Sequence, residues 1–329
     1  MDLSHLRLRY CRNSAIECTK RSPRWDDEGV SATIGTIMSL LVFLTMMGMF
    51  TNQFVPVWMS DNESTHMADA MTQIIGLKAD IDGMVVDYSD SQLAPAPIVA
   101  PITLHAPGIP IFAEATSGIL QFNHETTYAK PCMNVSYDEG GTDGYVLGPT
   151  TGGHSGGYLS LYSPNRYYVE QRLIYENGAV ILNQTDGEFV VTGPQFAVSD
   201  VSGSRVVKIT QVSMLGMNKT IGGTGTKLVN AEMLYAGTTE LRNDGGNDVT
   251  ISIVSIYGSA WENYFKNALN GSLADLDYTS DYSVSKEAYP FVYLGRSIHY
   301  YVVTVVIHDV NILEHSRATL QVSLGDVAA

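Results

Sequence analysis

Cysteine is scarce in this chain of 329 residues, which contains only Cys11, Cys18 and Cys132. Because Cys132 stands alone after residue 18, no intrachain disulfide is expected to stabilise the larger part of the chain. Cys11 and Cys18 do not have zinc-ligand spacing, and no histidines at ligand spacing accompany them. We therefore expect both to be free thiols, and we predict neither a metal site nor a cofactor.

Basic residues are also few, with 19 Lys and Arg against 34 Asp and Glu, for a net charge of −15. A surface with this excess of negative charge argues against nucleic acid as a partner. Its simplest meaning is solubility in salty surroundings.

Charge of either sign is absent from residues 29–60. A bilayer core of about 30 Å needs roughly 20 helical residues, so this run is long enough to cross it. The run lies behind a polar leader of 28 residues and is too long for the apolar part of a secretory signal. We predict a transmembrane or filament-core helix over residues 29–59, with membrane lipid as its partner.

The flanks of this run predict its orientation. Six Lys and Arg residues precede it in the leader 1–28, and none follows it before Lys78. The side richer in Lys and Arg stays cytoplasmic. No other window reaches spanning length, since Tyr300–Ile307 is too short and rich in β-formers. We expect a single-pass protein of the cell membrane, with the leader inside and the C-terminal domain outside.

Residues 29–36 (GVSATIGT), which open the apolar helix behind a basic leader, resemble the N-termini of archaeal type IV pilin-like proteins with class III signal peptides. The resemblance implies a prepilin-type peptidase that cuts between Gly29 and Val30. It also implies self-association, or packing against other pilin subunits, through the released helix. The family favours Lys or Arg before the cut, whereas residues 26–28 are acidic here, so an uncleaved anchor stays open beside a processed pilin.

A second resemblance lies in residues 158–183, which contain the pattern S-P-N followed by Y-E-N-G and a hydrophobic stretch. They look like the ectodomains of archaeal pilin-like surface proteins of unassigned function. This resemblance implies an extracellular β-rich domain.

Beyond the apolar run the sequence predicts a helical stalk over residues 60–90. Apolar residues recur there alternately four and three apart, the spacing of a helix that packs on another helix. They are Ala70, Ile74, Leu77, Ile81, Met84 and Tyr88. Pro56 is expected to kink the helix. Residues 91–110 contain many prolines and predict an extended linker between the stalk and the C-terminal domain.

From residue 111 to 329 the pattern has period two, which predicts one mainly β, sandwich-like extracellular domain in an α+β chain. One short helix is expected near residues 259–269, ended by Asn270-Gly271. Turn signals are expected at Asn177-Gly178, Asp186-Gly187, Gly222-Gly223 and Asp244-Gly245-Gly246. The predicted strands are 118–122, 158–162, 172–175, 179–182, 188–191, 206–214, 227–235, 249–257, 297–309 and 318–324.

One pattern suggests catalysis, because Gly153 to Gly157 form a G-x-S-x-G sequence around Ser155. In α/β-hydrolases this motif places a nucleophilic serine on a strand-to-helix turn, with an acid and a histidine later in the chain. Asp275 or Asp277 with His299 would complete such a triad. A predicted strand follows Ser155 instead of a helix, so a glycine-rich loop is the favoured interpretation.

Two further segments have the composition of ligand sites. Gly222–Lys227 lacks phosphate-loop spacing and is followed by no helix pattern. Asn243–Asp248 offers oxygens suited to Ca²⁺ but lacks the EF-hand glutamate, which favours a turn. Five N-x-S/T sequons predict N-glycosylation on the outer side. Their acceptors are Asn62, Asn134, Asn183, Asn218 and Asn270.

The favoured function is a non-enzymatic archaeal cell-surface protein, either a pilin-like subunit or a membrane-anchored ectodomain with a structural or adhesive role. One alternative is a minor pilin or pseudopilin of a secretion or pilus machine. From a different class, the alternative is a membrane-tethered serine hydrolase that uses Ser155.

Overall fold

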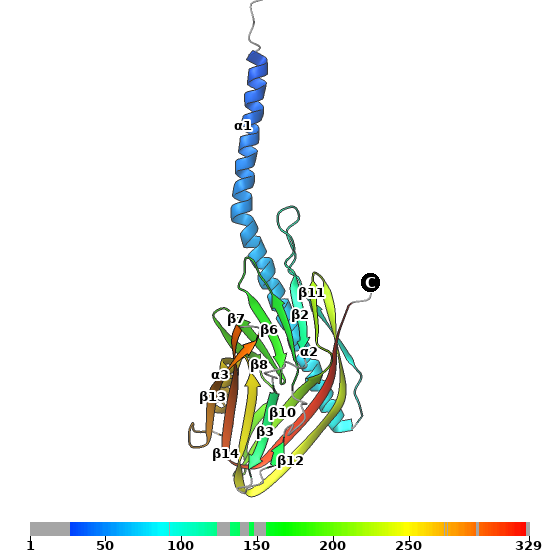
Figure 1. The fold of residues 1–329 in the computed structure, drawn as a ribbon, viewed down its shortest axis with the longest axis vertical. Helices are drawn as coiled ribbons and strands as arrows, with labels where there is room; N and C mark the ends of the chain where they lie inside the picture. Colours follow the sequence, from blue (N-terminus) through cyan, green and yellow to red (C-terminus); the bar gives the residue numbers. More distant parts are fainter. Residues whose placement is uncertain are drawn as a thin grey trace, which may run out of the picture. The chain divides into compact units, whose positions relative to one another are not determined.

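The computed structural model describes residues 27–91, 93–123, 132–138, 145–147, 156–272, 274, 276–293 and 296–326. The chain divides into two compact units, Met1–Gln53 and Phe54–Ala329. We call the second unit the β domain. Figure 1 shows that strands dominate it, which confirms the predicted α+β class and sandwich-like sheets.

In the first unit, helix α1 (Asp27–Met49) is followed by a π-helical turn, η1 (Phe50–Phe54). The wider turn comes directly before Pro56, where the sequence predicted a distortion. A proline ring clashes with the carbonyl one turn earlier and removes one backbone donor. Proline and π-helical turns are both recognised causes of a local break in α-helical hydrogen bonding.

The second long helix, α2 (Val55–Ser91), is part of the core of the β domain. Residues 60–90 are helical as predicted, but they do not form a stalk separate from the β-rich domain. The apolar stripe of α2 does pack against other elements, as the spacing indicated, but these are strands of the same domain. Val55 and Met59 are also buried, so the C-terminal end of the charge-free run 29–60 belongs to the domain. The buried core residues of the helix are Met67, Ala70, Ile74, Leu77, Ile81, Met84 and Val85.

The predicted linker 91–110 is also wrong in part. It contains strand β1 (Ile98–Thr103), which pairs antiparallel with β12. Ile102 and Leu104 are fully buried in the same core as α2. Pro101 lies within β1 and does not prevent the pairing, because β1 is an edge strand that pairs with β12 alone among the described strands.

Two sheets form the β domain. The eight-stranded sheet, which we call sheet A, has the order β4-β3-β12-β14-β10-β9, with β1 beside β12 and β13 beside β14. Its strands are β1, β3 (Cys132–Asp138), β4 (Tyr145–Leu147), β9 (Phe196–Val201), β10 (Ser204–Leu215), β12 (Thr226–Ser255), β13 (Tyr282–Tyr293) and β14 (Arg296–Asp326). The six-stranded sheet, sheet D, has the order β11-β2-β5-β6-β7-β8. Its strands are β2 (Gly118–Asn123), β5 (Tyr158–Ser163), β6 (Gln171–Glu176), β7 (Ala179–Gln184), β8 (Gly187–Thr192) and β11 (Lys219–Gly223).

Two very long strands organise sheet A. The predicted strands 227–235 and 249–257 are parts of one strand, β12, which ends at Ser255, two residues earlier than predicted. The predicted strands 297–309 and 318–324 are likewise parts of one strand, β14. The expected turn at 244–246 is a bulge, since β12 pairs with β14 on both sides of it. Gly222 and Gly223 are the last two residues of β11 in sheet D, and the next strand, β12, belongs to sheet A, so no hairpin forms there. The expected turns at Asn177-Gly178 and Asp186-Gly187 do connect paired neighbours.

Two hydrophobic cores lie on opposite faces of the β6–β7 hairpin. Leu173 and Tyr175 of β6 belong to the core that contains α2, whereas Ile174 belongs to the second core. Val180 and Ile181 of β7 divide in the same way. A strand buried on both faces needs an uninterrupted apolar run, which explains the hydrophobic stretch around Y-E-N-G.

The second core is covered by helix α3 (Gly258–Asn270), close to the predicted 259–269. Trp261, Phe265 and Leu269 of this helix are fully buried, and α3 contacts β8 and β13 (Figure 1). Glu188 of β8 accepts hydrogen bonds from the backbone N–H groups of Ser259 and Ala260, at 2.8 and 3.2 Å. A carboxylate at the first turn satisfies donors that a helix leaves unpaired and complements its dipole.

Candidate functional site

The most distinctive functional feature of the described residues is the exposed apolar surface of α1. Among these residues, one helix is long and apolar enough to cross a membrane, and its most apolar stretch is entirely exposed. Eight consecutive residues, 37–44, include seven large apolar side chains, so no side of the helix is polar. A helix that is apolar all round belongs in an apolar medium. The large exposed side chains are Ile34, Ile37, Met38, Leu40, Leu41, Val42, Phe43, Leu44, Met46 and Met49.

Three hydroxyl side chains in the middle of α1 are satisfied within the helix itself. Thr36 donates to the carbonyl of Thr33 at 2.8 Å, and Ser39 donates to the carbonyl of Thr36 at 2.9 Å. Thr45 donates to the carbonyl of Val42 at 2.9 Å. Unsatisfied polar groups cost several kcal/mol each in hydrocarbon, and these bonds remove that cost. The surface of α1 is therefore compatible with lipid despite its hydroxyl groups.

A buried carboxylate, Glu63, ties the start of α2 to two segments of the β domain. Its Oε1 accepts bonds from Thr116 Oγ1 at 2.8 Å and from the backbone N–H of Arg166 at 3.0 Å. Its Oε2 accepts bonds from the backbone N–H groups of Tyr167 and Tyr168, both at 2.8 Å. Burial raises the pKa of Glu63, but these bonds outweigh it and hold the pKa below its ordinary value. The three residues that follow the S-P-N pattern thus bind a structural carboxylate through their backbone N–H groups.

The second buried carboxylate, Glu176, belongs to the Y-E-N-G turn. Its Oε1 accepts bonds from Ser255 Oγ at 2.5 Å and from the indole N–H of Trp261 at 2.8 Å. Burial raises its pKa to about 7. A carboxyl group that titrates near neutrality is a typical candidate for general acid or base catalysis. Glu176 is only 1% exposed, however, and its partners are core residues, so it joins the hairpin to α3.

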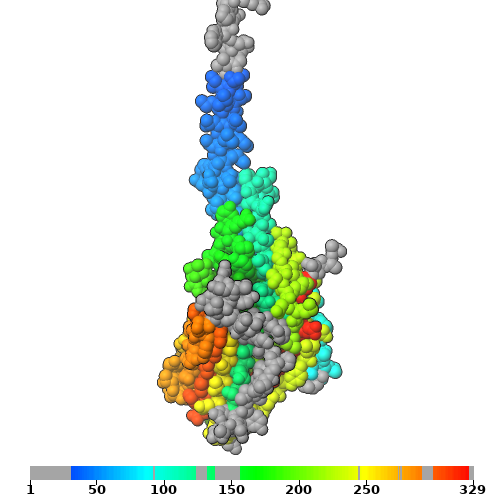
Figure 2. Space-filling view, in the orientation of Figure 1, coloured from blue at the N-terminus to red at the C-terminus, as the bar shows by residue number. Residues whose placement is uncertain are grey.

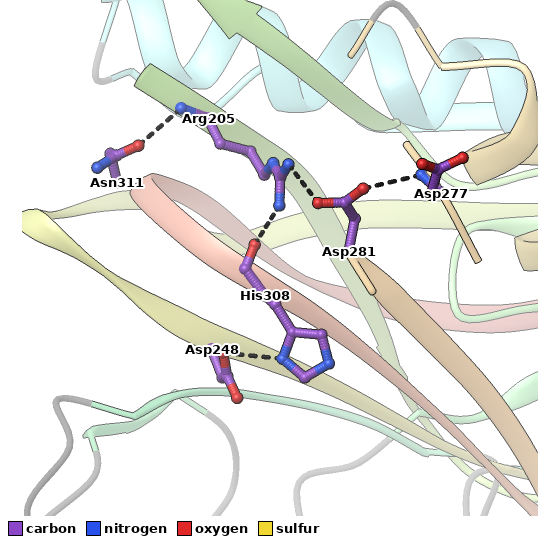
Figure 3. A network of polar contacts seen from close by, with 6 residues as sticks. All are labelled: Arg205, Asp248, Asp277, Asp281, His308 and Asn311. Carbon is purple, nitrogen blue, oxygen red and sulfur yellow. Dashed lines mark hydrogen bonds and ion pairs between the residues drawn. The ribbon is translucent and has the colours of Figure 1, made fainter. Parts of the chain in front are cut away.

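A third polar network surrounds Arg205 of β10, where this strand lies beside a bend of β14 at Asp309 (Figure 3). Its guanidinium donates to Asp281 Oδ1 at 2.9 Å and to the carbonyl of His308 at 2.5 Å. Its backbone N–H donates to Asn311 Oδ1 at 2.8 Å. Hydrogen bonds from the Asp277 backbone and from Arg205 hold the pKa of Asp281 below its ordinary value. Asp309, between His308 and Asn311, has a φ of 55°, so the network fixes a bend that extended pairing would not produce.

The segment Asn243–Asp248, weighed as a Ca²⁺ site, forms the bulge of β12 beside this network. Asn243 Oδ1 accepts a bond from the Gly245 N–H, and Asn243 Nδ2 donates to Asn247 Oδ1, both at 2.9 Å. Asp248 Oδ1 lies 3.0 Å from His308 Nδ1. The side-chain oxygens of Asn243, Asn247 and Asp248 therefore contact groups within and beside the bulge. Within the part of the chain that the structure describes, no group of three or more His, Cys, Asp or Glu side chains could hold a metal ion.

Only part of the hydrolase hypothesis falls within the described residues. Ser155 and Asp275 lie outside the described residues, as do Cys11 and Cys18. Strand β5 begins at Tyr158, so a strand follows the motif as predicted. A Cβ atom on Gly157 would lie 2.7 Å from the Met214 carbonyl oxygen, which explains this glycine by packing. Asp277 lies in the exposed loop before β13, and His299 pairs with Pro290 in the sheet.

The sequons differ in accessibility. Asn218 and Asn270 are exposed, whereas Asn62, Asn134 and Asn183 are partly buried. Asn62 Nδ2 already donates to the Pro107 carbonyl at 3.0 Å. Glycosylation stays a prediction, which the exposure favours at Asn218 and Asn270. Gly29 and Val30, the expected cleavage position, lie within the backbone of α1.

The sequence signal for Glu63 was present but was not recognised. It lies seven residues before Ala70, on the apolar stripe of α2, and a charge on such a stripe indicates a buried partner. Glu176 likewise interrupts an apolar run. Arg205 carries no comparable signal, because its partners follow more than 75 residues later in the chain.

Comparisons with known proteins give one match. No curated protein and no solved structure matches the chain. The model of one protein family, described as a family of unknown function (DUF7289), matches residues 143–312. This segment runs from β4 into β14 and covers more than half of the sequence. The chain therefore belongs to the family of unknown function DUF7289.

Proposed function

We propose that this protein is a non-enzymatic cell-surface protein, held in the cell membrane by one N-terminal helix and exposing the β domain outside the cell. The observation that carries the proposal is α1, whose apolar side chains are exposed all round and whose hydroxyl groups at Thr36, Ser39 and Thr45 bond to its own backbone. Water would oppose such a surface, whereas a lipid bilayer would favour it.

The charge distribution supports the orientation. Six Lys and Arg residues precede α1, and the β domain that follows is acidic. Lys and Arg near a span favour its cytoplasmic end. The leader is therefore inside, and the β domain is outside.

The polar groups of the β domain support a structural role over a catalytic one. Glu63 and Glu176, the two most deeply buried carboxylates among the described residues, both satisfy donors that hold elements together. Arg205 has the same role at the bend of β14. A structural or adhesive function at the cell surface uses such a rigid domain.

A second candidate is a pilin-like subunit, including a minor pilin or pseudopilin. It is favoured by the resemblance of residues 29–36 to archaeal pilin-like N-termini and by the uniform apolarity of α1, which also suits a filament core. In that case a prepilin-type peptidase removes the leader between Gly29 and Val30, and α1 packs against other subunits.

The test combines alkaline extraction of native membranes with a charge placed in the helix. Leu41→Asp puts a carboxylate at the centre of α1, where insertion costs roughly 2.5–3.5 kcal/mol. We expect the wild type to stay in the carbonate-washed pellet and Leu41→Asp to move to the supernatant. The matched control is Met217→Asp, which adds the same charge at an 86% exposed position of the β domain and should stay in the pellet. Extraction of the wild type by carbonate would contradict the anchor.

Mass spectrometry of the native N-terminus distinguishes the two candidates. A mature protein that begins at Val30, recovered in sheared filaments, would establish the pilin. A membrane protein that retains residues 1–28 would establish the uncleaved anchor.

A further inference from the structure

The most exposed apolar side chain among the described residues lies at the tip of a short hairpin, residues 106–116, which we call the apolar hairpin. Ile111 at its tip is 99% exposed. The seven residues from Pro107 to Ala113 (PGIPIFA) include no charged side chain. Isolated apolar residues are normal on protein surfaces, but an uncharged tip that presents one so fully suggests an apolar partner.

The hairpin is a built structure. Ala106 and Thr116 exchange backbone hydrogen bonds of 3.1 and 3.2 Å, and Ile109 accepts bonds from the N–H groups of Phe112 and Ala113. A Cβ atom on Gly108 would lie 2.4 Å from the Ala113 carbonyl oxygen, so the close approach of the two arms requires glycine there. Ile111 has a φ of 74°, which is unusual for a β-branched residue and holds its side chain outward at the turn.

The base of the hairpin is fixed to the start of α2. Asn62 donates to the Pro107 carbonyl at 3.0 Å, and Thr116 donates to Glu63 at 2.8 Å. Figures 1 and 2 show the hairpin at the end of the β domain where α2 begins. Phe54 lies about 12 Å from the level of Asn62, at about 1.5 Å per helical residue. The five steps from Ala106 to Ile111 span up to about 16 Å at about 3.3 Å each, so the hairpin is long enough for its tip to reach the level of Phe54.

Other apolar side chains are exposed at this end of the β domain. Phe54, Val57 and Trp58 are 47%, 57% and 44% exposed. The rings of Phe54 and Trp58 lie 6.2 Å apart. Trp is enriched where a protein meets the interface of a membrane.

We propose that the tip of the apolar hairpin, together with Phe54 and Trp58, inserts into the outer interface of the membrane that α1 spans. This inference rests on the proposed function. Phe54 is covalently bonded to Gln53, the last residue of the unit that contains α1. If α1 crosses the bilayer, chain connectivity alone brings the Phe54 end of the β domain to the membrane surface. A lipid interface then covers the apolar residues at that end and fixes the orientation of the domain.

The test uses the full chain in phospholipid vesicles, with a polarity-sensitive fluorophore on a single cysteine. The native Cys11, Cys18 and Cys132 are first replaced by alanine, and circular dichroism must show an unchanged fold. Ile111→Cys carries the probe at the tip. Met217→Cys carries the control probe at an exposed site far from the hairpin. Met217 lies two residues before Lys219, which pairs with Phe122 at the end of β2 that is remote from the hairpin.

We expect the emission of the probe at 111 to shift to the blue on reconstitution and to be quenched by lipids that carry a nitroxide near the headgroup. The probe at 217 should show neither effect. If both probes behave like water-exposed ones while the protein resists carbonate, the anchor stands and the hairpin inference fails. A blue shift at 111 without lipid quenching would show a protein partner or a second copy and would also overturn it. Failure to resist carbonate would overturn the proposed function itself.

Discussion

Replacing Ile74 with alanine tests whether α2 is a core helix or a stalk. Ile74 is fully buried in the core that α2 shares with sheets A and D. Truncating a buried isoleucine to alanine costs about 2–5 kcal/mol. We expect the upper half of this range, because paired strands surround the site and can close the cavity only partly.

The assay is urea unfolding of the β domain, residues 54–329. With an unfolding slope of about 2–3 kcal/mol per molar urea, the midpoint of Ile74→Ala should fall by about 1.2–2.5 M. The matched control is Val86→Ala on the same helix. Val86 is 48% exposed, and its replacement should change the free energy of unfolding by about 0.5 kcal/mol or less.

A truncation extends the same reasoning. The six large side chains that α2 contributes to the core stabilise the domain by about 1.5–3 kcal/mol each. Together these contributions match or exceed a total stability of about 5–15 kcal/mol. A fragment that starts at Ile111 should therefore be unfolded. A cooperative transition in that fragment, or an unchanged midpoint in Ile74→Ala, would show that α2 is a stalk and would refute the reasoning.

Glu63→Gln should destabilise the β domain by about 2–4 kcal/mol at pH 7, because an amide cannot accept all four bonds. Since folding lowers the pKa of Glu63, the stability that the carboxylate adds should vanish as the pH falls through the folded-state pKa. An equal difference in unfolding free energy between wild type and variant at pH 3 and pH 7 would contradict this. Glu176→Gln should stabilise the domain by about 3 kcal/mol at pH 8 and little at pH 4. The reason is that the pKa of Glu176 is about 7 in the folded state, against an ordinary value of 4.5, so the wild type loses stability as the pH rises from 4.5 to 7. Urea titrations at pH 4 and pH 8 check this, and destabilisation by the substitution at pH 8 would refute it. Ile111→Gly should stabilise the β domain by about 1 kcal/mol, because glycine adopts a φ of 74° without strain, and a loss of stability would show that the side chain packs on protein.

Local signals predicted the local elements correctly. Asn270-Gly271 marked the end of α3, and Asn177-Gly178 marked the turn between β6 and β7, where both residues have positive φ. Each of these features depends on residues within a few positions of one another. Alternating β-branched and aromatic residues likewise located β2, β5, β10 and both ends of β12.

Elements whose definition depends on distant partners were not predictable. The apolar stripe through Ile74 fits a helix that packs on a helix and one that packs on a sheet equally well. Only the strands that follow in the chain, from β1 to β14, decide between them. The four residues Asn243–Gly246 have turn chemistry, yet pairing with β14 on both sides makes them a bulge. Strands β3, β9 and β13 were missed for the same reason, since long-range pairing overrides weak local preference.

The contact of Glu63 also determines which part of the chain folds as one unit. Glu63 and Thr116 lie outside the segment that matches the family, whereas Arg166, Tyr167 and Tyr168 lie within it. The three matched residues donate through backbone N–H groups, so the contact demands no particular side chains there and leaves no motif in that segment. It does demand a carboxylate at position 63, at the start of α2. One carboxylate thus joins the helix that follows the anchor, the base of the apolar hairpin and the β5–β6 loop, so the end of the domain that the proposal places at the membrane is part of the same folded core.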